Sequence, residues 1–102
     1  VTVVDSQFTG NTAYNGGAIA NNGNLDVSGA TFKGNTASNW GGAIVNWQDM
    51  TVKGSTFEDN VAGVVGGAIG SDSTSNAVNI ASSVFKNNHS VMMAEPLAVT
   101  RD

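Results

Sequence analysis

The residues able to carry acid–base chemistry are few in this 102-residue chain and follow no regular spacing. Only 12% of the residues are charged, whereas cleavage of a polysaccharide needs a carboxylate pair, or a basic residue beside a carboxylate, within a groove. Some charged residues could share one face without forming a recognisable catalytic constellation: Asp26, Lys33, Asp49, Lys53 and Glu58. We therefore expect a protein that is not an enzyme.

Residues that could bind a metal ion are equally sparse. His89 is the only histidine and there is no cysteine, so a metal centre built on those ligands is not expected. The aspartates do not recur at a common position, which argues against a periodic calcium site; they include Asp5, Asp26, Asp49, Asp59 and Asp72. The sequence predicts no metal and no other cofactor.

Side chains suited to binding a partner stand in the stretches that vary most along the chain. Tyr14, Trp40 and Trp47 could form an exposed aromatic patch for stacking on a sugar or for a contact between subunits. The alternative, that they shield a corner or cap the core, is equally open. Asp72 lies in a polar loop of residues 71–77, which is either a binding loop or a solvated one.

Composition excludes several classes of partner. The formal net charge is −4 with only four Lys and Arg residues, so a surface that follows a phosphate backbone is not expected, and we predict no nucleic-acid partner. No run of 18 apolar residues occurs, so this segment is not expected to span a membrane. Since 40% of the residues are hydrophobic, the chain can build a core.

An internal repeat sets the elements that must position these side chains. The tetrapeptide Phe-x-x-Asn occurs four times and Gly-Gly-Ala-Ile three times, in strict alternation. The Phe residues are spaced by 24, 25 and 28 residues and the Gly-Gly pairs by 25 and 25. Apolar residues alternate with others before each Phe, which is the period-two pattern of a strand. The density of Gly and Asn opposes helices.

A strand-patterned repeat of about 25 residues predicts an all-β parallel β-helix (solenoid). We expect a single segment over residues 1–102, with coils that start near Val1, Leu25, Met50 and Val78. Residues 89–102 would form a degenerate last coil or an end cap. Successive coils would lie about 4.8 Å apart, so equivalent side chains should stack into columns.

Both tetrapeptides have a structural interpretation. We expect the rings of Phe8, Phe32, Phe57 and Phe85 to stack inside the tube. We expect an Asn column at a corner, where Asn tolerates left-handed backbone and its side-chain amide can bond to the coil above: Asn11, Asn35, Asn60 and Asn88. The Gly pairs would allow positive φ or close approach of the chain: Gly16 and Gly17, Gly41 and Gly42, Gly66 and Gly67. The core partners of the rings would be Ile19, Ile44 and Ile69.

The alternating tetrapeptides resemble those of the passenger domains of the chlamydial polymorphic outer membrane proteins. The resemblance covers nearly the whole chain, from Val1 to Asn88. It implies a right-handed parallel β-helix, export by autotransport and adhesion to host cells, with both tetrapeptides tied to adhesion. After Asn88 the expected Gly-Gly-Ala-Ile is replaced by residues 92–96, Met-Met-Ala-Glu-Pro.

Together these observations predict a non-enzymatic, adhesin-like or structural β-helix located outside the cell or at its surface, secreted or associated with an outer membrane. Its partner would be a receptor or glycan on a host cell or other surface. One alternative is a subunit of an extracellular filament formed by end-to-end stacking of copies. A lesser alternative is a β-helix that binds or cleaves polysaccharide.

Overall fold

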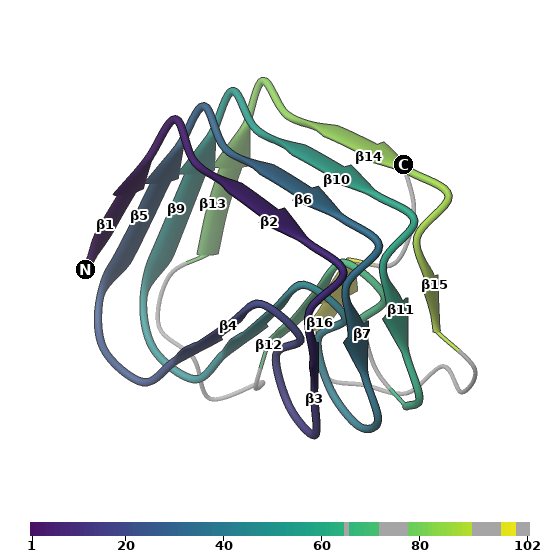
Figure 1. Cartoon of the computed structure of the whole chain (residues 1–102). Coiled ribbons are helices and arrows are strands. Elements are labelled where there is room, and N and C mark those ends of the chain that lie inside the picture. Colours follow the sequence, from purple (N-terminus) through teal and green to yellow (C-terminus); the bar gives the residue numbers. More distant parts are fainter. Residues whose placement is uncertain (65, 72–77, 91–96, 100–102) are drawn as a thin grey trace.

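The computed structural model describes residues 1–64, 66–71, 78–90 and 97–99, and every regular element among them is a β-strand (Figure 1). The strands form four sheets, and each sheet takes one strand from each successive turn of the chain. Three of the sheets are parallel throughout. The predicted all-β parallel solenoid is therefore confirmed, while its right-handed winding stays a prediction.

Each sheet is named here by the order in which the chain enters it. The first sheet contains β1 (Thr2–Val4), β5 (Leu25–Ser28), β9 (Met50–Lys53) and β13 (Val78–Ala81). The second contains β2 (Gln7–Thr9), β6 (Thr31–Lys33), β10 (Thr56–Glu58) and β14 (Val84–Lys86). The third contains β3 (Thr12–Ala13), β7 (Thr36–Ala37), β11 (Val61–Ala62) and β15 (His89–Ser90). The fourth contains β4 (Ile19–Asn21), β8 (Ile44–Asn46), β12 (Ile69–Ser71) and β16 (Leu97–Val99).

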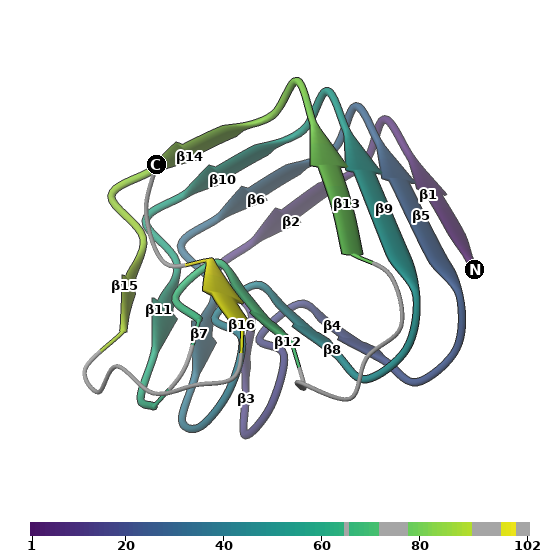
Figure 2. The ribbon, with the colours of Figure 1, turned by 180° about the vertical axis from the view of Figure 1, so that it is seen from behind.

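The two ends of the solenoid differ. At the N-terminal end, β1 to β4 form a complete coil whose outer edge carries no further strand within the described residues. At the other end, β13, β14 and β15 continue the first three sheets, but β16 lies antiparallel to β12, with Val99 opposite Ile69 (Figure 2). The fourth sheet therefore ends on a reversed strand. Residues 92–96, where the repeat departs from Gly-Gly-Ala-Ile, lie outside the described residues.

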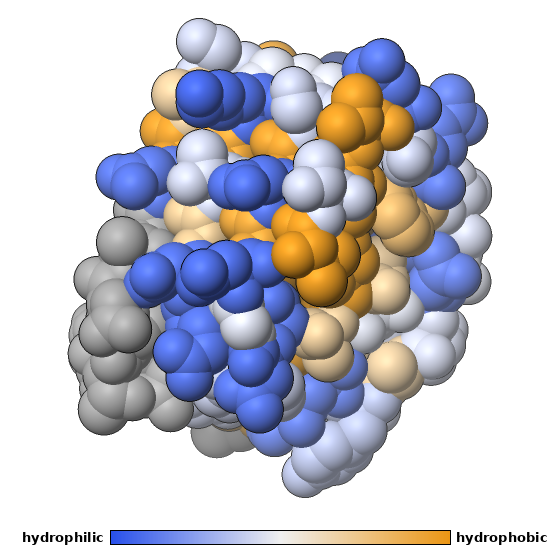
Figure 3. All heavy atoms as spheres, turned by 90° about the vertical axis from the view of Figure 1, so that its left-hand side faces the viewer, coloured by the Kyte–Doolittle hydropathy of each residue, from blue (hydrophilic) through white to orange (hydrophobic). Residues whose placement is uncertain are grey.

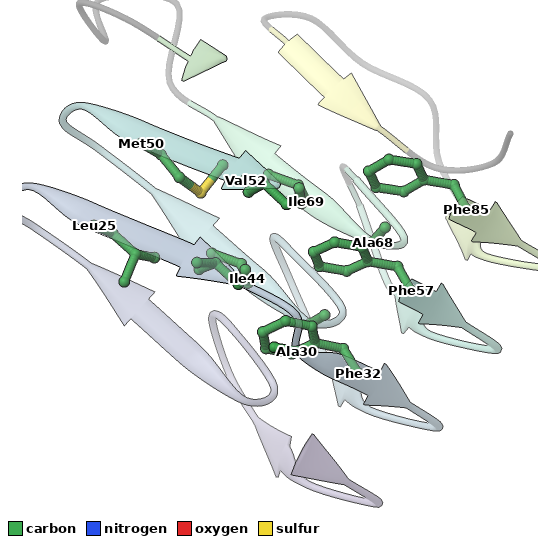
Figure 4. Close-up of a cluster of buried hydrophobic side chains, with 12 residues drawn as sticks. Leu25, Ala30, Phe32, Ile44, Met50, Val52, Phe57, Ala68, Ile69 and Phe85 are labelled. Carbon is green, nitrogen blue, oxygen red and sulfur yellow. The ribbon is translucent and has the colours of Figure 1, made fainter. Parts of the chain in front are cut away.

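The core lies between the sheets because side chains alternate across each strand. In β5, Leu25 and Val27 are buried while Asp26 and Ser28 are exposed, as the two-residue period of a strand requires. Phe rings from the second sheet face aliphatic side chains from the first and fourth sheets (Figure 4). Ala43 and Ala68 are buried together with Ile44 and Ile69 that follow them, so both residues of the Ala-Ile pair contribute to the core.

The tight corners between sheets use left-handed backbone, but not at the Asn column. The expectation of left-handed geometry at the Asn residues is wrong, since it falls one position earlier, at Gly10, Gly34, Asp59 and Asn87, with φ of 67°, 65°, 57° and 56°. The corner between the first and second sheets follows the same rule at Asp5, Gly29, Gly54 and Ser82. The turn therefore leaves the Asn itself free to point inward and hydrogen-bond.

Candidate functional site: stacked columns and the turn ridge

The four phenylalanines form a continuous stack inside the solenoid. Adjacent ring centroids lie 4.9, 4.7 and 4.8 Å apart, and the ring planes are within 5–6° of parallel. The spacing follows from the parallel register, which places Phe8, Phe32, Phe57 and Phe85 opposite one another. Phe32 and Phe57 are 0% exposed, so a partner outside the solenoid cannot touch them.

The asparagine column is a ladder of hydrogen bonds with a fixed direction. The Nδ2–H groups of Asn11, Asn35 and Asn60 each donate to Oδ1 of the next Asn, at 3.0, 3.0 and 2.8 Å. Their backbone N–H groups donate to the same oxygens at 3.0, 3.0 and 3.1 Å. Asn35, Asn60 and Asn88 also donate back to the carbonyls of Phe8, Phe32 and Phe57. The amides of Asn35 and Asn60 thus each tie three coils together.

The two glycines of each Gly-Gly-Ala-Ile have different tasks. Gly16, Gly41 and Gly66 adopt φ of 64°, 68° and 71°, a conformation that favours glycine. The second glycine allows close approach of neighbouring coils: a Cβ on Gly17 would collide with the Gly42 carbonyl oxygen, and one on Gly42 with that of Gly67. A Cβ on Gly67 would meet the backbone of His89. Neither glycine offers a side chain to a ligand.

A second asparagine ladder was missed in the sequence. Asn21 and Asn46, both buried, close the corner between the fourth and first sheets, and Nδ2 of Asn21 lies 2.7 Å from Oδ1 of Asn46. The signal was available, because Asn stands two residues after Ile19 and Ile44. The repeat does not mark it as a column, because Ser71 occupies the matching place in the third coil.

The turns that join the third sheet to the fourth form what we call the turn ridge. It consists of residues 14–18, 38–43 and 63–68 except residue 65, and Figure 1 shows these turns projecting together beyond β3, β7 and β11. Asn39 Nδ2 donates to Asn15 Oδ1 at 3.0 Å, and Gly16 N–H donates to the Trp40 carbonyl at 2.8 Å. These bonds between coils hold the ridge in one shape.

The expected aromatic patch is distributed over two corners. Tyr14 is 68% exposed at the start of the turn ridge, directly after β3. Trp40 lies on the same ridge in the next coil but is half-buried, and Trp47 is half-buried at a different corner, between β8 and β9. Asp72 lies outside the described residues. Among the described aromatic side chains, Tyr14 is therefore the one that is freely presented to a partner.

The charged residues do not converge on one place. Asp26 and Lys53 are exposed on the first sheet, whereas Lys33 and Glu58 lie side by side in register on the second. The idea that they share one face is therefore wrong. Within the described ranges no group of three His, Cys, Asp or Glu residues could hold a metal ion. His89 is exposed on β15, in register with Val61.

The outer edge of the first coil is apolar and nearly uncharged. Phe8, Val3 and Ile19 are half-buried there, although their equivalents in the second coil are buried. Val1 and Val4 are 82% and 53% exposed, and Figure 3 shows apolar side chains gathered toward the β1 end of the first sheet. Asp5 is the only charged side chain among the first 24 residues. This edge therefore lacks the lysine or proline that usually protects an open strand.

Four sheets of stacked strands, three of them parallel throughout, together with columns of equivalent side chains and tight glycine turns, define a β-solenoid repeat protein. The Chlamydia polymorphic membrane protein repeat matches three consecutive stretches, residues 5–22, 29–46 and 54–72, which together exceed half of the chain. The chain belongs to this repeat family. Neither a search of curated proteins nor a search of solved structures found a significant match. In the part of the chain that the structure describes, there is no helix long and apolar enough to cross a membrane.

Proposed function

We propose that this chain is a non-enzymatic, adhesin-like segment that mediates adhesion at a cell surface. It acts outside the cell, secreted or associated with an outer membrane, and presents its turn ridge to a surface receptor or glycan. The observation that carries the proposal is that each repeat combines buried columns with variable residues nearer the surface. The ring and amide columns of the inner coils are buried, whereas the ridge residues before each Gly-Gly differ from coil to coil and are exposed or half-buried: residues 14–15, 38–40 and 63–64. Membership of the polymorphic membrane protein repeat family supports a surface location.

Tyr14 is the natural anchor of such a contact. Its ring is rigid and amphipathic, and it stands beside the Asn15 and Asn39 amides, which supply hydrogen-bonding groups. Because the ridge is already held by bonds between coils, little conformational entropy is lost when a partner binds. A sugar face stacked on Tyr14 or a receptor loop would both fit this chemistry.

The test compares two exposed side chains. Beads coated with the wild-type chain, Tyr14→Ser or Val84→Ser would be scored for attachment to cultured epithelial cells and to a glycan array. Val84 is a matched control because it is 55% exposed on the second sheet, away from the ridge. We expect Tyr14→Ser to lose attachment while Val84→Ser retains it, both with unchanged β-sheet circular dichroism. Full attachment by Tyr14→Ser would refute the ridge as the binding surface.

The absence of catalysis is part of the proposal and has its own assay. The chain would be incubated with pectin-like and alginate-like polymers, and the release of reducing ends or unsaturated products would be followed. No turnover is expected, because the charged side chains are few and are spread over separate sheets, whereas polysaccharide cleavage needs acid and base groups gathered in a groove. Clear turnover would favour the polysaccharide-cleaving alternative.

A second candidate function, end-to-end assembly into a filament, is favoured by the direction of the Asn ladder. Within the described residues, Oδ1 of Asn11 accepts no hydrogen bond, while the backbone N–H of Asn88 at the other end finds no acceptor. Stacking the first coil of one copy on the last coil of another would join this donor to that acceptor. Two first coils face to face would oppose two acceptors, so only a head-to-tail contact extends the ladder, and such contacts propagate.

Electron microscopy and sedimentation of the purified chain test this candidate. Asn11→Lys places a charge on the open edge and should block assembly, because edge lysines oppose strand addition. Asn22→Lys adds the same charge to an exposed corner of the same coil and should leave assembly intact. A monodisperse wild-type monomer at all concentrations, or filaments formed equally by Asn11→Lys, would contradict the assembly.

A further inference from the structure

The same dipeptide, Asn-Gly, occurs twice in the first coil, as Asn15–Gly16 and as Asn22–Gly23. In an Asn-Gly pair the backbone nitrogen of the glycine can attack the side-chain amide carbon of the asparagine, since no Cβ hinders the approach. The attack is intramolecular, so its rate depends on whether the local structure lets the two atoms meet. The two pairs differ sharply in that respect.

Asn15–Gly16 is locked within the turn ridge. Oδ1 of Asn15 accepts hydrogen bonds from Nδ2 of Asn39 at 3.0 Å and from the backbone N–H of Trp40 at 3.3 Å. The attacking nitrogen, that of Gly16, already donates to the Trp40 carbonyl at 2.8 Å, and Gly16 is buried. Reaction here requires the turn to open first.

Asn22–Gly23 is open to solvent. Both residues are exposed, and no heavy atom lies within 4 Å of the position that a Cβ on Gly23 would take. Within the described residues the Asn22 side chain makes no hydrogen bond, and the Gly23 N–H has one, at 3.2 Å to Oδ1 of Asn21. This bond is longer than the 2.8 Å bond of the Gly16 N–H, and Gly23 itself is exposed whereas Gly16 is buried.

We propose that Asn22 is a site of self-modification by deamidation. The nitrogen of Gly23 bonds to Cγ of Asn22, the bond from Cγ to Nδ2 breaks, and ammonia leaves with the proton from Gly23, which closes a succinimide ring. Water then opens the ring at either carbonyl and yields aspartate or isoaspartate. The net reaction consumes one water and releases one ammonia, and it needs no other reactant.

The modified corner would hold the first coil less firmly. The Asn21 side chain, next to the reacting residue, donates to the Gly23 carbonyl at 2.9 Å and to Oδ1 of Asn46 at 2.7 Å. Isoaspartate adds one carbon to the backbone between Asn21 and Gly23. The hydrogen bond from the Asn21 side chain to the Gly23 carbonyl therefore cannot keep its geometry. The result is a new carboxylate at position 22 and a weakened tie between the first and second coils.

The experiment follows deamidation at both sites of the intact 102-residue chain during incubation at mildly alkaline pH, with electron-transfer mass spectrometry to separate Asn15 from Asn22. We expect Asn22 to react at least about tenfold faster than Asn15, because the Asn15 site must open locally first. The same chain in urea serves as reference, and there the two sites should react at similar rates. An equal rate at the two sites in the folded chain, or the same ratio in urea, would overturn the proposal.

Gly23→Ala provides the matched variant. The added methyl group meets no neighbour and the φ of Gly23 is not left-handed, so the fold should be unchanged by circular dichroism and thermal melting. The methyl group does hinder the attacking nitrogen. Deamidation at position 22 should then fall toward the rate at Asn15, and an undiminished rate in this variant would contradict the succinimide route.

Discussion

Nδ2 of Asn35 lies 3.0 Å from Oδ1 of Asn60, and the backbone N–H of Asn35 bonds to the same oxygen at 3.0 Å. Asn60 in turn donates to the carbonyl of Phe32 at 3.0 Å. One buried side chain therefore satisfies two donors and one acceptor of the coil before it. Because these groups are shielded from water, the free energy of unfolding depends on the bonds remaining intact.

Replacing Asn60 by alanine should destabilise the chain strongly. The substitution strands the two donors of Asn35 and the Phe32 carbonyl, and each buried unpaired group costs about 1–3 kcal/mol, so we expect a loss of about 3 kcal/mol or more. Urea unfolding followed by circular dichroism measures it. Asn22→Ala, at an exposed position, should change stability by less than about 0.5 kcal/mol. Equal effects of the two substitutions would contradict the ladder.

Truncation of a ring should lower the free energy of unfolding most at the centre of the Phe stack. Phe57 is 0% exposed and has a ring on either side, so Phe57→Ala should cost about 3–5 kcal/mol. Phe8 is half-buried and stacks on Phe32 alone among the described rings, so Phe8→Ala should cost clearly less. Chemical denaturation of both variants checks the order. A larger loss at Phe8 would mean that the open edge is covered in solution.

Much of the fold could be predicted because the same residue types recur at the same positions of each repeat. Phe8, Phe32, Phe57 and Phe85 share a position relative to Asn, and a fixed spacing in a strand-patterned chain leaves few architectures besides stacked coils. The columns then follow from parallel pairing alone. A column supported by four copies is visible in one sequence, whereas one supported by two copies, such as Asn21 and Asn46, is not.

Other features could not be read from spacing. The left-handed corner residue is Gly10 or Gly34 in two coils but Asp59 or Asn87 in the others, so residue type alone did not mark the position. The reversed direction of β16 depends on tertiary pairing with β12, which no local pattern of Leu97–Val99 encodes. Exposure of Trp40 and Trp47 was equally undetermined, because burial of a corner depends on the coil beside it.

Two substitutions at the left-handed corners should change the free energy of unfolding in opposite directions. Ser82 adopts φ of 52°, and Ser82→Gly should relieve about 1–2 kcal/mol of backbone strain while the more flexible unfolded chain offsets about 0.4–1 kcal/mol. The net result is a gain of about 0.5 kcal/mol. Gly34 has φ of 65° and no atom near the position of a Cβ. Gly34→Ala should therefore lower the free energy of unfolding by a similar amount. Melting temperatures of both variants test the pair, and stabilisation by Gly34→Ala would refute the corner geometry.

Substitution of the second glycine in Gly-Gly-Ala-Ile separates a structural from an adhesive role of that tetrapeptide. Gly42→Ala drives a methyl group into the Gly67 carbonyl and the backbone of Val61, so it should cost about 3 kcal/mol or more, since backbone cannot move aside as a side chain can. Adhesion should then fall only in proportion to the unfolded fraction, measured on the same preparation by circular dichroism. Gly23→Ala, which meets no neighbour, should keep both stability and adhesion. If Gly42→Ala stayed folded but failed to adhere, the tetrapeptide would contact the partner directly, and the binding surface would include the Gly-Gly backbone of the ridge as well as Tyr14.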